Sequence, residues 1–300
     1  MRIWMLGVGA LAAVGTAGGR DRAALVIAGD GVRATSVMGA PGRLRIDPAA
    51  PGMPILNPDY AVRARLRSGP LSAGYGVGPV RVDGRTAVAR IDLGRGPVRR
   101  RVTWTARPFV RDADAAVGPG GLPDLVVRFQ LRPARPGERV AALPMAGNGL
   151  IGGWGMSMGV ATVDGGPVRV RFDLRRPTVA TAGAGVAIAR AGGGVLEGAP
   201  GVTEVAFGVE RPVRRLRLAR PVAVGPLLVG ELLVRVSDFG STASIADADA
   251  APPDPDEVIV TARGERNRGR DQLTLGRDQL ARCSSITFDK PAKRIVLSCL

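Results

Sequence analysis

The sequence contains no histidine, only two cysteines, and aromatic residues amount to 4% of its 300 residues. The absence of histidine excludes His-based catalytic triads and His metal sites, and two cysteines are too few for a zinc cluster. A metal site could use only carboxylates, and we expect neither a metal nor a cofactor. Since apolar residues reach 45% while aromatics are rare, we expect a core built mainly from Val, Leu, Ile and Ala.

Lysine is also scarce, because 40 of the 42 basic residues are arginines and the formal net charge is +16. Such a charge would suit a nucleic-acid-binding protein, but no aromatic residues are interleaved with the arginines to stack on bases. Several arginines alternate along expected strands: Arg43 and Arg45, Arg169 and Arg171, Arg215 and Arg217. Alternation places residues on one face of a strand. We therefore predict a solvated or anion-facing basic face and no nucleic-acid partner.

Glycine and proline, in contrast, are plentiful, with 43 and 24 residues spread along the chain. Such punctuation favours many short strands and turns over long helices. A chain of 300 residues suggests two domains of ordinary size. The composition therefore predicts an all-β protein with two domains and short helices.

The chain begins with a segment typical of exported proteins. Met1-Arg2, an apolar run from Ile3 to Val14 and the small residues Gly15–Gly19 match the three regions of a signal peptide. We predict that residues 1–18 are a cleaved signal peptide and that the mature protein is periplasmic or secreted. A buried first strand or helix is the alternative. The apolar run is too short for a comfortable membrane span, so we expect no stable span in the mature form.

The two cysteines lie at the ends of an expected hairpin. Two β-type runs, Ser284–Phe288 and Arg294–Ser298, flank a turn at Asp289–Lys293, which places Cys283 opposite Cys299. Cross-strand neighbours have a separation that a disulfide can use, and a disulfide fits an oxidising compartment. We predict this disulfide; two free thiols at a strand edge are the alternative.

The chain carries an internal repeat. Its firmest part is the match of Gly39-Ala-Pro-Gly-Arg-Leu-Arg-Ile-Asp47 with Gly165-Gly-Pro-Val-Arg-Val-Arg-Phe-Asp173, at an offset of 126. Two shorter matches support it: Val77-Gly78-Pro79 with Val224-Gly225-Pro226 at 147, and Ala116-Val117-Gly118 with Thr274-Leu275-Gly276 at 158. Since the order is kept and the offsets only grow, we expect insertions of about 21 and 11 residues in the second copy.

Each copy reads as the same unit, a strand ending in an aspartate, an Ala-rich helical stretch, several strands, an apolar pair with glycine, and a last strand. The helical stretches are expected at Tyr60–Leu66 and Thr181–Arg190. We predict a first lobe over residues 19–133 and a second over 134–300, with an exposed insertion at 242–270.

These residues resemble the pepsin/retropepsin-like aspartic peptidases. In that family each lobe contributes an Asp-Thr/Ser-Gly motif after a strand, and a hydrophobic-hydrophobic-Gly run passes through it as a ψ-shaped loop. By resemblance, Asp47 and Asp173 are the candidate catalytic residues. Gly118 and Gly276 belong to the second motif and are candidate binding residues, and Leu273–Leu280 looks like the family's Leu-Gly-x-Asp-x-Leu stretch. The resemblance implies two tandem β-barrel lobes of the acid-protease type.

The residues after each aspartate depart from the family. The chain reads Asp47-Pro48-Ala49 in the first copy and Asp173-Leu174-Arg175 in the second, so the hydroxyl and the glycine are missing from both. Aspartic peptidases need two carboxylates that share a proton. Arg175 would place a cation beside a carboxylate and lower its pKa, which disfavours sharing.

We therefore expect a catalytically impaired aspartic-peptidase-like protein that binds an extended peptide or a periplasmic or envelope protein. The alternative is an active aspartic endopeptidase using Asp47 and Asp173. Tyr75, in a Gly-rich turn, is a candidate flap residue that binds peptide; a half-buried turn aromatic is the other interpretation. Inside the insertion, Asp256–Arg263 resembles a short segment near the N-terminus of TonB-dependent receptors and could pair with a partner's sheet edge. An ordinary solvated loop strand is the alternative there.

Overall fold

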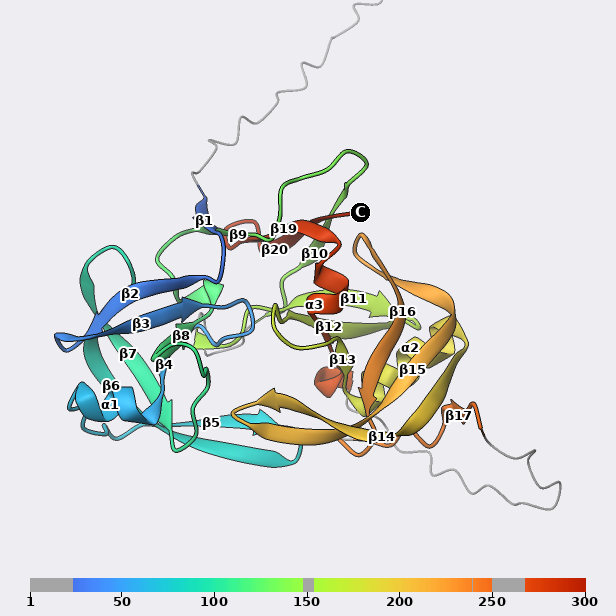
Figure 1. Cartoon of the computed structure of the whole chain (residues 1–300), viewed down its shortest axis with the longest axis horizontal. Helices are drawn as coiled ribbons and strands as arrows, with labels where there is room; N and C mark the ends of the chain where they lie inside the picture. Colours follow the sequence, from blue (N-terminus) through green and yellow to red (C-terminus); the bar gives the residue numbers. More distant parts are fainter. Residues whose placement is uncertain (1–23, 148–153, 239, 250–267) are drawn as a thin grey trace, which may run out of the picture.

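The structure, a computed structural model of the chain, describes residues 24–147, 154–238, 240–249 and 268–300. The predicted signal peptide and the segment 256–263 lie outside these ranges. Two lobes stand side by side, and a third sheet spans the space above them (Figure 1). In the described ranges, no helix is both long enough and apolar enough to cross a membrane. The expected all-β, two-lobed architecture is confirmed.

The first lobe is built on a sheet of seven described strands. Their order is β2 (Val32–Val37), β3 (Ala40–Ile46), β8 (Ala115–Val117), β4 (Ile55–Leu56), β7 (Pro97–Thr105), β6 (Val80–Asp92) and β5 (Ser72–Val77). Helix α1 (Pro58–Arg63) follows β4 and begins with a proline in its first turn, a favoured position for that residue. Strand β5 forms one edge of the sheet.

The second lobe repeats this plan in a sheet of eight described strands. Their order is β11 (Gly159–Val163), β12 (Gly166–Phe172), β18 (Gln272–Leu275), β13 (Val179–Ala180), β16 (Leu227–Arg235), β15 (Val209–Val224), β14 (Gly194–Ala206) and β17 (Ala246–Asp247). Helix α2 (Ala182–Gly192) follows β13; Thr181 caps its start and Gly193, with φ +64°, ends it. Both expected helical stretches are therefore confirmed.

The third sheet takes strands from both halves of the chain. Among the described residues its order is β1 (Leu25–Ile27), β9 (Val126–Gln130), β19 (Cys283–Asp289), β20 (Arg294–Cys299) and β10 (Arg139–Pro144). Short helical turns precede two of these strands: a 3₁₀ turn at Pro119–Gly121 and helix α3 (Arg277–Leu280). Because β9 pairs with β19, this sheet ties the two halves together. The lobe boundary at residue 133 stays a prediction.

The repeat is visible in how the strands pair. In the first lobe β3 runs parallel to β8, with Ile46 opposite Val117, and β8 runs antiparallel to β4. In the second lobe β12 runs parallel to β18, with Phe172 opposite Leu275, and β18 runs antiparallel to β13. The apolar pair before Gly118 and the one before Gly276 thus thread between the aspartate strand and the next strand, as the ψ-shaped loop requires.

One of the predicted matches is wrong. Gly78-Pro79 forms the turn between β5 and β6, but Gly225-Pro226 forms the turn between β15 and β16, which corresponds to the β6–β7 turn. The turn equivalent to Gly78-Pro79 is Phe207-Gly208, between β14 and β15. Gly-Pro pairs suit any tight turn, so a short match between them does not identify equivalent turns.

The insertion in the second copy is therefore distributed differently from the sequence-based expectation. In the first lobe Thr103 pairs with the first residue of β4, and in the second lobe Leu233 pairs with the first residue of β13. These equivalent residues are 130 positions apart in the sequence, whereas Val117 and Leu275 are 158 positions apart. About 28 residues are thus added in one place, between β16 and β18. This segment includes residues 242–270, and its described part contributes β17, which pairs with β14.

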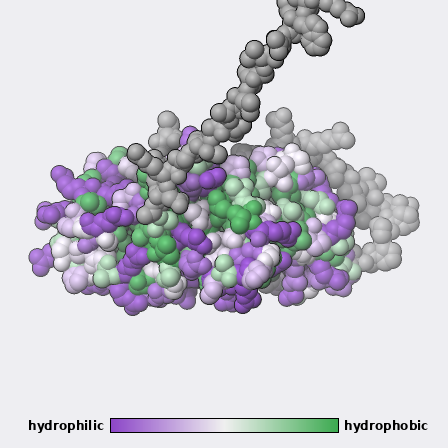
Figure 2. Space-filling model, turned by 90° about the horizontal axis from the view of Figure 1, so that it is seen from above, coloured by the Kyte–Doolittle hydropathy of each residue, from purple (hydrophilic) through white to green (hydrophobic). Residues whose placement is uncertain are grey.

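The core is aliphatic, as predicted. It is formed largely by Val, Leu, Ile and Ala, and three aromatic side chains, Phe129, Phe172 and Phe288, stack edge to face where the third sheet meets the second lobe. Seen from above, hydrophilic residues cover the two ends of the elongated molecule and hydrophobic residues gather in patches between them (Figure 2).

The predicted disulfide is confirmed. Cys283 lies opposite Cys299 in the β19–β20 hairpin, the two are bonded, and both are buried. The turn falls at Lys290–Lys293, as the sequence suggested. The bond therefore closes the hairpin that ends the third sheet.

We expect the double substitution of Cys283 and Cys299 by serine to lower the free energy of unfolding by about 3 kcal/mol, because the unfolded chain regains the entropy of an open loop. Urea unfolding of the mature protein measures this. Reduction of the wild type by dithiothreitol should give a similar loss, while the double variant should not respond to it. Equal stability of both proteins would contradict the prediction.

Candidate functional site

The two predicted aspartates occupy the same point of the two repeats. Asp47 follows β3, and its backbone N–H donates to the carbonyl of Val117 (3.0 Å). Asp173 follows β12, and its N–H donates to the carbonyl of Leu275 (2.9 Å). Both side chains are buried, 4% and 1% exposed. The two ψ-shaped loops therefore hold the two carboxyl groups in matching, solvent-shielded positions.

Gly118 and Gly276 are required by close packing behind these loops. A Cβ on Gly118 would lie 2.1 Å from the carbonyl oxygen of Ala50, and one on Gly276 would lie 2.2 Å from the carbonyl carbon of Pro177. Neither clash could be relieved by rotating a side chain, because both involve backbone atoms. The structure thus gives both glycines a packing role, and their predicted binding role stays a prediction.

The carboxylate of Asp47 has a partner on each oxygen. The backbone N–H of Ala49 donates to Oδ1 (2.8 Å), and Nη2 of Arg175, from the other lobe, lies 2.9 Å from Oδ2. Burial raises the pKa of Asp47 above its usual value, and the nearby Asp173 adds to this, against the opposing effects of Arg175 and Arg171. The expected lowering of the pKa by Arg175 is therefore outweighed by burial.

Asp173 is held by donors from its own loop. The N–H groups of Arg175 and Arg176 donate to Oδ1 (2.9 and 3.1 Å), and Nη1 of Arg176 donates to Oδ2 (3.1 Å). Burial alone would raise its pKa, but the charges of Arg171 and Arg176 and these backbone bonds hold the pKa of Asp173 below its usual value. The environments of the two aspartates thus shift their pKa values in opposite directions.

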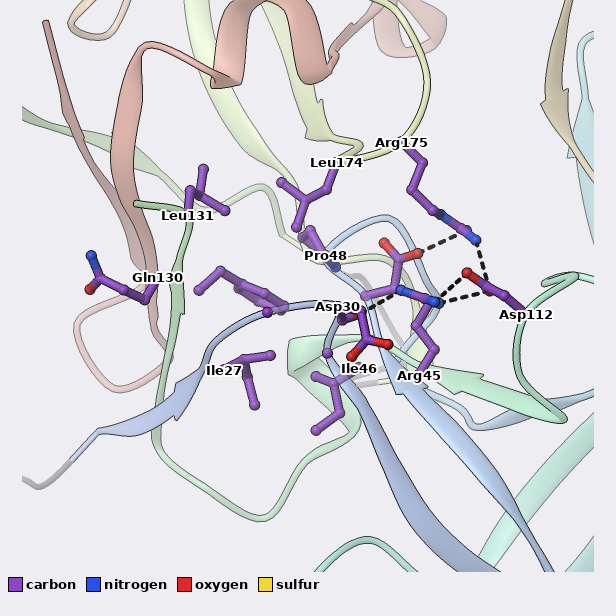
Figure 3. Close-up of a pocket in the computed structure, with 14 residues that line it drawn as sticks. Ile27, Asp30, Arg45, Ile46, Pro48, Asp112, Gln130, Leu131, Leu174 and Arg175 are labelled. Carbon is purple, nitrogen blue, oxygen red and sulfur yellow. Dashed lines mark hydrogen bonds and ion pairs between the residues drawn. The ribbon is translucent and has the colours of Figure 1, made fainter. Parts of the chain in front are cut away.

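The arginines extend this pair into a network between the lobes. Nη1 of Arg175 also lies 3.6 Å from Asp112, which in turn pairs with Arg45. Figure 3 shows Arg45 and Arg175 approaching Asp112 from two sides. Asn57, just before α1, fixes the loop that carries Asp112, because its side chain donates to the carbonyls of Val110 and Ala113.

A second branch of the network involves Glu204, on β14. Nη2 of Arg176 donates to Glu204 (2.6 Å), and Arg111, from the first lobe, pairs with the other oxygen of Glu204 (3.1 Å). Ion pairs therefore connect the lobes through Asp47 and through Glu204. Asp47 and Asp173 are buried, whereas Arg111 and Asp112 are exposed, so the outer pairs of the network contribute little by themselves.

Arg45 and Arg171 correct the prediction of a solvated basic face. Each lies two residues before its aspartate and is buried, 7% and 4% exposed, whereas Arg43, Arg169, Arg215 and Arg217 are exposed as expected. Nη2 of Arg171 donates across the lobe interface to the carbonyl of Ala49 (2.6 Å). Alternation put these arginines on one face correctly, but Arg171 is covered by the loop after Asp47, and Arg45 is bonded to Asp30 and Asp112 of its own lobe.

Tyr75 lies on β5, at the side of the first lobe that faces β14 (Figure 1). Its ring packs on that of Phe207, at the tip of the β14–β15 hairpin (5.0 Å between centroids), and Phe207 packs on Phe109 (5.1 Å). Burial raises the pKa of Tyr75 to about 12. Both earlier interpretations of Tyr75 remain open, but its position shows that the two hairpins meet across the space between the lobes.

Two cavities lie at or near the aspartate loops. Asp47 borders one of about 260 Å³, walled by Ile27–Gly31 and Phe129–Leu131 (Figure 3). Another, of about 300 Å³, lies beneath the β5–β6 hairpin and is bordered by Pro51, Tyr75 and Arg171. Neither aspartate is among the described residues that line this second cavity. The cavity beneath the hairpin is therefore bordered by Arg171 and by neither of the two aspartates.

No family model matches the sequence, and no curated protein matches it. Among solved structures, the chain is similar to the aspartic proteinase from Irpex lacteus, with a TM-score of 0.44 and 11% identity over 89% of this chain and 93% of that one. At this level of likeness we rest no functional argument on the match.

Proposed function

We propose that this chain is an exported binding module on the two-lobed aspartic-peptidase plan, with its two aspartates used for structure instead of catalysis. One observation carries the proposal. Every carboxylate oxygen of Asp47 and Asp173 has an arginine or a backbone N–H as partner. A carboxylate that holds a guanidinium is not free to take a proton from water, which is the step that the peptidase reaction requires.

An extended peptide is the proposed ligand. Strand β5 is the edge of its sheet among the described strands, so its outer backbone groups can pair with an added strand. Beside it lies a cavity of about 410 Å³, lined in part by Met53, Leu71, Trp154 and Met156. These side chains offer an apolar surface for alternate side chains of a peptide, while the backbone pairing would not depend on its sequence.

Export is part of the same proposal. The Cys283–Cys299 disulfide fits an oxidising compartment such as the periplasm or the extracellular medium. The predicted signal peptide at residues 1–18 would deliver the chain there. N-terminal sequencing of the protein recovered from a secreting host tests it: a mature chain that begins near residue 19 supports the proposal, and an intact Met1 counts against it.

The alternative of an active endopeptidase is favoured by one observation. The pKa of Asp47 is raised and that of Asp173 is lowered, and an acid–base pair needs such a difference. In that case Asp47 would carry the proton and Asp173 would be the base. Arg175 would have to leave Asp47 when substrate binds.

Peptide cleavage at acid pH distinguishes the two functions. We expect the mature wild-type protein to cleave a mixed pool of quenched-fluorescent octapeptides no faster than a variant with both Asp47 and Asp173 replaced by asparagine. A control with Asp83→Asn, an exposed residue paired with Arg81, corrects for handling. Cleavage that is present in the wild type and in the control but absent in the double variant would establish the endopeptidase instead.

A further inference from the structure

The cavity beneath the β5–β6 hairpin is strongly cationic. Its described lining includes Arg169, Arg171, Arg235 and Arg270 and contains no aspartate or glutamate. Guanidinium groups stay charged at all relevant pH values. The cavity therefore gathers positive charge at a point where a peptide lying along β5 would place part of its chain.

Two of these arginines are buried with unused donors. Arg171 and Arg235 are 4% and 5% exposed, and the Nε of each has no hydrogen-bond partner among the described residues. A buried donor without an acceptor is unfavourable, so both guanidinium groups have hydrogen-bonding capacity that the described residues leave unused.

Both side chains are held in place by contacts with other residues of the protein. Arg171 donates to the carbonyl of Ala49, and Arg235 forms an ion pair with Asp238, which is itself buried. Asp238 packs against the hairpin tip, where a Cβ on Gly78 would lie 2.3 Å from its carboxylate. The cationic groups are thus fixed before a ligand arrives, which reduces the ordering cost of binding.

Other parts of the lining are apolar and aromatic. The ring of Phe207 packs against those of Tyr75 and Phe109, and Met156 and Val205 also line the cavity. A small inorganic anion would leave these parts unfilled. The lining suits a ligand with an apolar or aromatic body and one anionic end.

We propose that this cavity binds the carboxylate of a ligand that also carries an apolar or aromatic group. The inference rests on the proposed peptide-binding function and names the class of peptide. The carboxylate comes either from a peptide C-terminus that follows an apolar residue or from an acidic side chain next to one. Arginine binds a carboxylate through two parallel N–H donors, so a neutral amide of the same shape binds more weakly.

Isothermal titration calorimetry with 3-phenylpropionate and its neutral analogue 3-phenylpropionamide tests the cavity directly. We expect the carboxylate to bind the mature protein at least about 10-fold tighter than the amide, since a hydrogen bond to a charged group contributes roughly 1.5–3 kcal/mol. Added salt should weaken the binding of the carboxylate and leave the binding of the amide unchanged.

Matched variants locate the site. Arg169→Gln should lower the affinity for phenylpropionate several-fold, while Arg43→Gln, at the equivalent exposed position of the first repeat, should leave it unchanged. Arg235→Gln combined with Asp238→Asn removes both partners of the buried pair, which avoids an unpaired charge, and should abolish the preference. Equal affinity for the two probes, or a preference that Arg169→Gln and the Arg235/Asp238 double variant both retain, would overturn the proposal.

Peptides then separate this inference from the function on which it rests. An apolar hexapeptide ending in Phe is titrated with a free carboxylate and as its amide, and a blocked hexapeptide is titrated with an internal Glu or Gln. Tighter binding of one acidic member identifies the source of the carboxylate. If both members of each pair bind equally, peptide binding stands and the carboxylate site fails. If phenylpropionate binds and no peptide does, the site stands and the peptide-binding function fails.

Discussion

Replacing Asp173 with asparagine is expected to lower the free energy of unfolding by about 3–5 kcal/mol at neutral pH, because the change breaks the ion pair of a buried carboxylate with Arg176 and removes a negative charge that stabilises the buried Arg171. The same substitution at Asp47 is expected to cost far less or to stabilise the protein. Burial disfavours the ionised form of Asp47, and an asparagine oxygen can still accept the N–H of Ala49. Two residues at equivalent positions should thus respond unequally to the same substitution.

The pH dependence follows from the directions of the two pKa shifts. The folded pKa of Asp173 is lowered, so its contribution is present above the unfolded value of about 3.9 and is lost as the pH falls through the folded pKa. The folded pKa of Asp47 is raised. Its contribution is therefore present below the unfolded value and is lost as the pH rises through the folded pKa.

Urea unfolding of the wild type, Asp47→Asn and Asp173→Asn at neutral and at acid pH measures both effects. The difference in free energy of unfolding between the wild type and Asp173→Asn should become smaller at acid pH. The free energy of unfolding of Asp47→Asn should increase relative to that of the wild type as the pH rises. Asp83→Asn, which changes an exposed ion pair, should differ from the wild type by less than about 1 kcal/mol. If Asp47→Asn and Asp173→Asn lowered the free energy of unfolding equally, the surroundings of the two aspartates would be equivalent, which would contradict the structure.

The aspartates and the ψ-shaped loops could be predicted from the sequence because their signal is local. A strand of alternating residues that ends in Asp47 recurs before Asp173, and an apolar pair with glycine follows at the right distance in each copy. The backbone of Gly118 packs so tightly that only glycine fits, and such a constraint leaves a trace in the sequence. The disulfide hairpin was predictable for the same reason.

The ion-pair network could not be predicted, because it depends on how the lobes face each other. Alternation shows that Arg171 lies on one face of β12, but not that the loop after Asp47 covers it. Arg175 was expected to act on a nearby carboxylate, yet its partner is Asp47, from the other repeat. Pairing between lobes is set by the relative placement of two sheets, and no local pattern encodes that placement.

The turn at Phe207 shows a signal that the sequence reading overlooked. A two-residue hairpin turn with positive φ at both positions favours Asn or Gly at the first, and Phe207 has a φ of +57° there. A bulky residue in this region is strained by roughly 1–3 kcal/mol and persists only where its surroundings hold it. An aromatic residue before the glycine of a tight turn therefore indicates a tertiary contact.

Truncation of Phe207 to alanine is expected to lower the free energy of unfolding by about 3–5 kcal/mol, because its ring is buried between the lobes against Tyr75 and Phe109. Its removal should also loosen the contact between the two hairpins. Amide hydrogen exchange should then rise in β5 and at residues 105–114, and much less in the third sheet.

Met38 provides the matched control for this substitution. It occupies the first position of the β2–β3 turn with a φ of +52°, but its side chain is 56% exposed, so Met38→Ala should change stability by no more than about 0.5 kcal/mol. Phe207→Gly separates packing from backbone strain: it relieves the strained φ and should be less destabilising than Phe207→Ala by about 1 kcal/mol. A Phe207→Ala variant as stable as Met38→Ala would mean that the aromatic stack does not hold the lobes together.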